Sequence, residues 1–197
     1  KTIDEKSKKI IELMSKQADR MEKLIDDLLL LSKVESDYLH NRSEKIIMKD
    51  LFKKFKSEVS LIDKQQHKII YSINTEINIY GSKSEVYSAF INLLTNAIRY
   101  TDEEGEISVS WNKINNDAIF QVTDKGIGIP EKHVNRITER FYRVDEDRSR
   151  QSGGTGLGLS IVKNVMYQHQ GEIRVASEHN SGSSFKLIFP TERIFLK

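Results

Sequence analysis

A long helical repeat at the start of the chain is the feature that most constrains its fold. Between residues 3 and 35, apolar side chains recur at alternating spacings of three and four, with Ser7 and Gln17 as the polar positions. The repeating residues are Ile3, Ile10, Met14, Met21, Leu24, Leu28 and Leu31. Because Ile11 and Ile25 widen this stripe on one side, it suits a helical hairpin or a four-helix bundle better than a two-stranded coiled coil.

This helix is longer than an ordinary globular helix, and a polar stretch without periodicity follows it at residues 36–45. We therefore predict an oligomerisation helix and a linker, with a core helix of a single domain as the alternative. If Leu24, Leu28 and Leu31 had no partners, they would form an exposed apolar patch, so some self-association is expected.

The pattern changes after the linker. Helices are predicted at 50–63, 84–100 and 156–169, with Asp50 as the N-cap of the first, and strands are predicted near 46–49, 67–73, 77–80, 106–113, 117–124, 171–177 and 183–189. An irregular segment separates the fifth strand from the last helix. Strands and helices that do not strictly alternate indicate an α+β fold, here a two-layer sandwich of one mixed sheet with helices on one face. The predicted division is 1–40 for the helix and linker and 41–197 for the domain.

Composition excludes several classes of protein. The 31 basic and 29 acidic residues leave a net charge of +2, so no nucleic-acid partner is expected. The absence of cysteine excludes disulfides and thiolate metal sites. The sequence contains no run of 18 apolar residues, the length that a membrane-spanning helix needs. The chain begins with Lys1 rather than Met. We expect a piece of a longer protein whose membrane contact, if it has one, lies in segments before Lys1.

The glycine-rich run from Gly153 to Ser160 almost matches two phosphate-binding loops. It is not a Walker A loop, because Leu159 stands where that loop needs lysine. It is one residue short of a dinucleotide-binding fingerprint, and a polar loop precedes it rather than a strand. Glycines at the start of a helix still allow backbone N–H groups to approach an anion. The alternative is a flexible hinge.

Two further groups of residues suggest a nucleotide. Asp124 ends a predicted strand and precedes Gly126 and Gly128, so its carboxylate could accept a hydrogen bond from an exocyclic amine and favour adenine over guanine. The alternative is an ordinary turn. Asn92 and Asn96 lie four residues apart on one helix face, where amide oxygens could bind Mg²⁺ that carries phosphate. The alternative there is a plain helix surface.

The order and spacing of these groups resemble the N, G1 and G2 boxes of the sensor histidine kinases. These enzymes belong to the GHKL group, which also contains DNA gyrase and a heat-shock chaperone. Residues 138–150 resemble the F box of the ATP lid, 182–185 the last glycine motif, and 21–36 the second helix of the dimerisation and histidine-phosphotransfer bundle. The resemblance therefore covers nearly the whole chain and implies the GHKL (Bergerat) form of the sandwich.

The resemblance implies ATP and Mg²⁺ as cofactors and assigns roles to individual residues. Asp124 would bind the adenine amine, Asn96 with Asn92 would bind Mg²⁺, and Arg99 would contact phosphate. Phe141 would pack the lid, and Arg143 would stabilise the transferring γ-phosphate, so the expected catalytic residues are Asn92, Asn96 and Arg143. The remaining expected cofactor contacts are Tyr100, Gly126, Gly128, Ile129, Tyr142, Gly154, Thr155, Gly156, Leu157 and Gly158. Arg148 and Arg150 are expected to be solvated.

One position separates the kinases from the ATP hydrolases of the group. The hydrolases carry a glutamate four residues before the metal-binding asparagine, and this chain has Asn92 there. An amide is too weak a base to activate water, which favours a kinase. A GHKL ATPase clamp and a non-catalytic dimerisation or nucleotide-sensing module remain the alternatives.

The phosphoacceptor histidine is not expected in this chain. None of its five histidines begins a motif like that of the family's acceptor; they are His40, His67, His133, His169 and His179. His169, at the end of a helix, is expected to be structural. The resemblance thus implies transfer of the ATP γ-phosphate to a histidine elsewhere, relay to a response-regulator aspartate, and a dimer partner through the bundle. It further suggests the cytoplasmic part of an inner-membrane sensor kinase, similar to those of the phosphate regulon.

Overall fold

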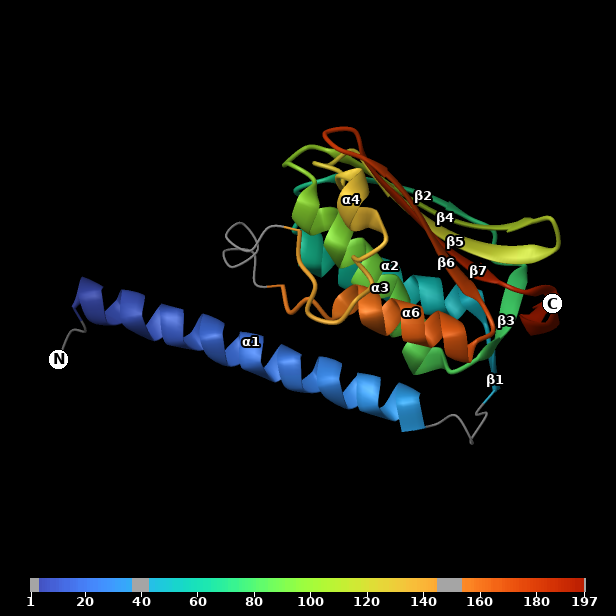
Figure 1. Cartoon of the computed structure of the whole chain (residues 1–197), viewed down its shortest axis with the longest axis horizontal. Coiled ribbons are helices and arrows are strands. Elements are labelled where there is room, and N and C mark those ends of the chain that lie inside the picture. Colours follow the sequence, from blue (N-terminus) through green and yellow to red (C-terminus); the bar gives the residue numbers. More distant parts are fainter. Residues whose placement is uncertain (1–3, 37–42, 145–153, 197) are drawn as a thin grey trace.

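The computed structural model describes residues 4–36, 43–144 and 154–196. A long helix, α1 (Glu5–Ser36), lies alongside a domain in which helices cover one face of a twisted sheet (Figure 1). The α+β sandwich and its long leading helix are therefore confirmed. In the described part of the chain, no helix is both long enough and apolar enough to cross a bilayer.

The main sheet has five strands in the order β2 (Lys68–Ile73), β4 (Glu106–Ile114), β5 (Asp117–Asp124), β7 (Gly182–Phe189) and β6 (Glu172–Glu178). The β2–β4 pair is parallel and the other pairs are antiparallel, which confirms a mixed sheet. The β4–β5 hairpin turns at Asn115 and Asn116, whose φ angles of 51° and 73° are those that a tight two-residue hairpin requires. Every second residue of β5 is buried, and this alternation directs Asp124 toward the helical layer.

Three helices form that layer: α2 (Met48–Asp63), α3 (Lys83–Tyr100) and α6 (Gly158–Gln168). The apolar face of α3 is buried throughout; it consists of Val86, Phe90, Leu93, Leu94 and Ala97. The Phe90 ring stacks on Phe120 of β5 with 3.7 Å between ring centroids, and Phe52, Phe55 and Trp111 surround the pair. Aromatic packing thus fixes α3 against the centre of the sheet.

A second, three-stranded sheet was not predicted. It has the order β1 (Glu44–Ile46), β3 (Ile77–Gly81) and β8 (Ile194–Leu196), with a short 3-10 helix, η2 (Thr191–Arg193), before β8. The predictions of a single sheet and of a strand at 46–49 were wrong. The first strand ends at Ile46 because α2 already begins at Met48.

The start of α2 also corrects the predicted cap. Ile47, not Asp50, is the N-cap residue, and Asp50 lies in the first turn. The Met48 N–H group instead donates to the Asn78 Oδ1 atom of β3 at 2.9 Å. An N-cap side chain usually accepts from the second or third residue of a helix, whereas here a residue 30 positions away accepts from the first.

His169, at the end of α6, is buried and structural, as predicted. Its Nδ1 atom lies 2.7 Å from the Val165 carbonyl oxygen, and its Nε2 atom accepts the Ser82 N–H at 3.0 Å. Burial lowers the pKa of His169, which keeps the ring neutral in this bonding pattern. The ring therefore ties the end of α6 to the start of α3.

Helix α1 packs against α6 through one part of its surface. Leu31 is 3% exposed and belongs to the main core, and Leu24 is partly buried against that core. Leu24 and Leu31 therefore have partners within this chain and do not form an exposed patch with Leu28. Leu28 remains exposed, together with Ile10, Met14 and Met21.

Candidate functional site

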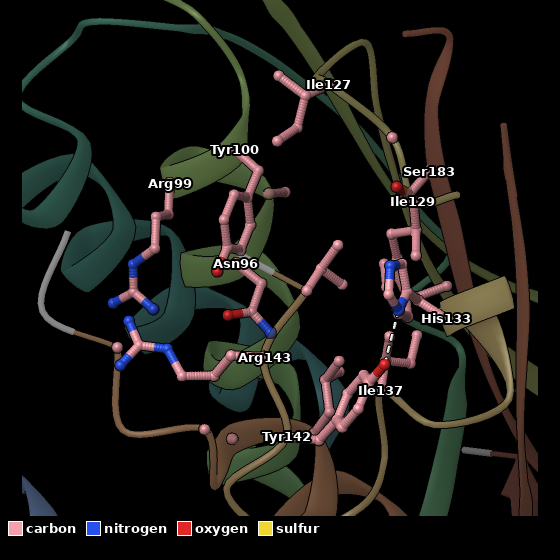
Figure 2. A pocket seen from close by; sticks show the side chains of 18 of the residues that line it. Asn96, Arg99, Tyr100, Ile127, Ile129, His133, Ile137, Tyr142, Arg143 and Ser183 are labelled. Atoms are coloured by element: carbon pink, nitrogen blue, oxygen red, sulfur yellow. Dashed lines mark hydrogen bonds between the residues drawn. The ribbon is translucent and has the colours of Figure 1, made fainter. Parts of the chain in front are cut away.

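One cavity of about 420 Å³ collects most of the predicted site residues. It lies between α3, the segment after β5 with its short helix α4 (Glu131–Val134), and the start of α6 (Figure 2). All predicted cofactor residues except Gly126 and Leu157 line it. Arg148 and Arg150 lie outside the described residues.

At one end of the cavity lies Asp124, at the end of β5. The residue is 6% exposed, and its carboxylate accepts hydrogen bonds from the Gly126 and Ser183 N–H groups at 2.9 and 3.2 Å. Both hydrogen bonds use the Oδ1 atom. Desolvation raises the pKa of Asp124, and the two N–H bonds oppose that rise. This end therefore holds a buried carboxylate oriented by backbone donors.

The glycines after Asp124 are needed for close backbone contacts. A Cβ atom on Gly126 would collide with the Tyr100 carbonyl oxygen, and one on Gly128, whose φ is +62°, would collide with the carbonyl oxygen of Glu178. The neighbouring Ile127 N–H donates to the Tyr100 carbonyl at 3.1 Å. These contacts explain why Gly126 does not line the cavity: it faces the end of α3 instead.

Helix α3 presents a row of polar side chains along the other wall. Asn92, Asn96, Arg99 and Tyr100 all line the cavity, because they lie three or four residues apart or adjacent at the helix end. The Asn92 Nδ2 group donates to the Ser88 carbonyl at 3.0 Å, and its Oδ1 atom faces the start of α6. A Cβ atom on Gly158 would come within 2.7 Å of this Oδ1, so glycine permits the close approach of the two helices.

Figure 2 shows Arg99 and Arg143 with their guanidinium groups close to each other, on the side of the cavity away from Ser183. Since the Ser183 N–H bonds to Asp124, this is the end opposite that carboxylate. A Cβ atom on Gly154 would meet the Arg99 Nη1 atom at 2.9 Å, which places the glycine loop beside the same charge. Two guanidinium groups on one wall of a pocket make that end strongly positive and suited to an anion.

Backbone contacts join the start of the predicted ATP lid, at Phe141, to the glycine-rich loop. The Phe141 N–H donates to the Gly156 carbonyl at 2.9 Å, and a Cβ atom on Gly156, whose φ is +75°, would lie 2.9 Å from the Phe141 Cα atom. Phe141 has a φ of 61°, rare for a residue with a side chain, and its side chain is 57% exposed. Phe141 therefore contacts Gly156 through its backbone, and its packing of the lid stays a prediction, because residues 145–153 lie outside the described ones.

Sequence reasoning missed His133 and Ser183. The His133 Nδ1 atom lies 2.6 Å from the Tyr142 hydroxyl oxygen (Figure 2). The Arg136 guanidinium lies 4.3 Å from the centroid of the Tyr142 ring. No local spacing signals that pair. Ser183 could have been predicted from the sequence by pairing the strands now called β5 and β7 in antiparallel register, which places it opposite Asp124.

Comparison with known proteins identifies the family. Residues 81–193 match the family described as histidine kinase-, DNA gyrase B-, and HSP90-like ATPases. The chain belongs to this family. The predicted resemblance to the GHKL group is thus confirmed, and the domain is of the ATPase type that forms the catalytic part of histidine kinases.

Curated relatives extend the similarity to more than nine-tenths of the chain. The phosphate regulon sensor protein PhoR of Pseudomonas aeruginosa is 37% identical over 93% of this chain and 42% of its own length. The sensor histidine kinase RppB of Synechocystis is 34% identical over 92% of this chain and 40% of its own length. This chain therefore spans less than half the length of these relatives.

Solved structures agree on the fold. The mycobacterial sensor histidine kinase MprB superposes with a TM-score of 0.66 at 25% identity, covering 75% of this chain and 97% of that one. The Acinetobacter baumannii histidine kinase AdeS gives a TM-score of 0.74 at 22% identity, covering 98% and 88%. Full-length ShkA, solved in complex with AMPPNP, gives 0.77 at 19% identity, covering all of this chain and 41% of that one.

Proposed function

We propose that this chain is the ATP-binding and catalytic part of a sensor histidine kinase. It transfers the γ-phosphate of ATP to a histidine outside this chain, for relay to an aspartate of a response regulator in two-component signal transduction. The observation that carries this proposal is one cavity with a buried carboxylate at one end and paired amides with two arginines at the other.

Adenine recognition rests on Asp124. Its Oδ1 atom is occupied by two backbone N–H groups, so its other oxygen is the one available to an exocyclic amine. Adenine offers such an amine at C6, whereas guanine has a carbonyl there that the carboxylate would repel. Tyr100, Ile129 and Tyr142 supply apolar walls for the base.

The opposite end suits magnesium and phosphate. Asn96 and Asn92 would bind Mg²⁺ through amide oxygens, since this ion takes few protein ligands when phosphate oxygens and water complete its shell. When bound, the ion would neutralise charge on the phosphates. Arg99 and Arg143 would hold the phosphate oxygens, and the loop Gly154–Gly158 would offer N–H groups at the start of α6.

Asn92 favours transfer over hydrolysis. Its amide already donates to Ser88 and has no basic group that could deprotonate water. A hydrolysing ATPase of the gyrase or chaperone kind is the second candidate, supported by the breadth of the matching family.

The partners follow from α1 and from the relatives. The exposed apolar row of α1, which contains Ile10, Met14, Met21 and Leu28, would pack in a helical bundle with a dimer partner. The response regulator would receive the phosphate, as the named sensor kinases suggest. We further propose a cytoplasmic location beneath an inner membrane, with the anchor in segments outside this chain.

The test is phosphate transfer from radiolabelled ATP, with Mg²⁺, to the histidine-bearing first helix of the bundle supplied in trans. Labelling should require Asn96, so Asn96→Ala should lose it while circular dichroism shows an intact fold. Calorimetry should detect ATP binding with a clear preference over GTP. Steady hydrolysis without any acceptor, or equal affinity for the two nucleotides, would reject the proposal.

A further inference from the structure

A hydrogen bond joins α1 directly to the glycine loop. The Thr155 hydroxyl donates to the Asp27 Oδ2 atom at 2.8 Å, across 128 positions of sequence. Asp27 is only 9% exposed and lies on the face of α1 that also carries Leu24 and Leu31. The contact therefore belongs to a packed interface in which α1 lies beside α6 (Figure 1).

The Thr155 hydroxyl also bonds to the backbone of the glycine-rich loop. The Thr155 Oγ1 atom accepts the Leu157 N–H at 3.2 Å, so the bonds run from Leu157 through Thr155 to Asp27. Leu157 is the N-cap residue of α6, and N–H groups at a helix start are the ones that bind phosphate. In this arrangement the Leu157 N–H is bonded within the protein rather than offered to an anion.

The negative charge of Asp27 also disfavours phosphate at this end of the cavity. Thr155 and Lys23 of α1 both line the cavity, so Asp27 stands next to the end where the phosphates would enter. Burial raises the pKa of Asp27, with a smaller contribution from Asp26, whereas the Thr155 hydrogen bond and the positive charges of Lys23 and Arg99 oppose that rise. A triphosphate at this end would meet a carboxylate of the same sign and would compete for Arg99.

We propose that Asp27 is a positioning residue that holds the glycine loop in a conformation unfavourable to phosphate. Docking of α1 and binding of the triphosphate therefore oppose each other, and by linkage ATP weakens the docking of α1 as much as α1 weakens ATP binding. This inference rests on the proposed function, since it concerns the same cavity.

Calorimetry of the full chain with ATP and Mg²⁺ tests this. Asp27→Ala should bind ATP about fivefold or more tightly than the wild type, the size of a typical coupling between sites. Asp27→Asn, whose amide oxygen can still accept from Thr155, should fall between the two. Adenosine, which lacks phosphates, should bind the wild type and Asp27→Ala equally, a result that a general structural change would not give.

The matched control is Asp26→Ala, which removes the same charge from an exposed neighbour and should leave ATP affinity unchanged. Hydrogen exchange in the second half of α1 should rise on addition of ATP. Equal or weaker ATP binding by Asp27→Ala, or a gain that adenosine shares, would overturn the inference. If wild-type protein bound no ATP, the proposed function itself would fail, and the two failures are thus distinguishable.

Discussion

The two ends of the cavity are built differently. At the Asp124 end, the backbone itself does the positioning: two N–H groups orient the carboxylate, and glycines bring the loop against the carbonyl groups of Tyr100 and Glu178. At the other end, long side chains and a loop from separate segments converge, and α1 contacts one of them. The base site is therefore preformed, whereas the phosphate site depends on how the segments are placed.

The largest expected effect is on the preformed end. Asp124→Asn keeps an oxygen for the two N–H groups but presents an NH₂ group to the adenine amine. We expect ATP affinity to fall about 100-fold, or about 3 kcal/mol, as for loss of a charged hydrogen bond. Calorimetry measures it, with Asp117→Asn at the other end of the same strand as the control. An unchanged affinity would remove Asp124 from base recognition.

Replacing one glycine by alanine at each end of the cavity tests the difference between the two ends directly. Gly128→Ala forces a side chain into φ +62° and against the Glu178 carbonyl, so it should cost about 2–3 kcal/mol of unfolding free energy and lower Tm by about 5–10 °C. Gly154→Ala meets only the movable Arg99 guanidinium and should change stability by less than about 0.5 kcal/mol. Thermal denaturation distinguishes them, and equal losses would contradict the contrast between the two ends.

A smaller effect is expected at the hydrogen bond between His133 and Tyr142, which anchors the residue before Arg143. Tyr142→Phe should slow phosphate transfer about fivefold, the value of one hydrogen bond of about 1 kcal/mol. His133→Leu should do the same, and the double variant should be no slower than either. Additive losses would show that the two side chains act separately.

The smallest effect concerns pH and separates binding from stability. Because burial raises the pKa of Asp124 above its ordinary 3.8, folding favours the protonated form, and the stability that this group contributes is lost as pH rises through the raised pKa. ATP affinity should move the other way, falling as pH drops through that value, because a protonated carboxyl is a poorer acceptor. Calorimetry and thermal denaturation across acidic pH measure both, and parallel trends would contradict the assignment.

Local patterns in the sequence predicted most of the domain. The ranges predicted for β5 and α3 agree with the structure, the buried side chains of both follow the period of their element, and the Asn115–Asn116 pair suits a tight hairpin turn. These patterns agree with the structure because the period of a helix or strand and the backbone preferences of glycine and asparagine act within a few residues. The single-sheet prediction failed because β1 and β8 are short and pair with β3 from opposite ends of the chain.

By itself, the sequence determined most of the elements, the order of the boxes and hence the family. Only the tertiary structure decided which partners meet: Asn78 with the start of α2, His133 with Tyr142, and Asp27 with Thr155. The physical reason is that such bonds join side chains whose proximity depends on the packing of whole elements. Neither partner of Asp27–Thr155 carries a local pattern that points to the other, so the coupling of α1 to the glycine loop became visible only in the fold.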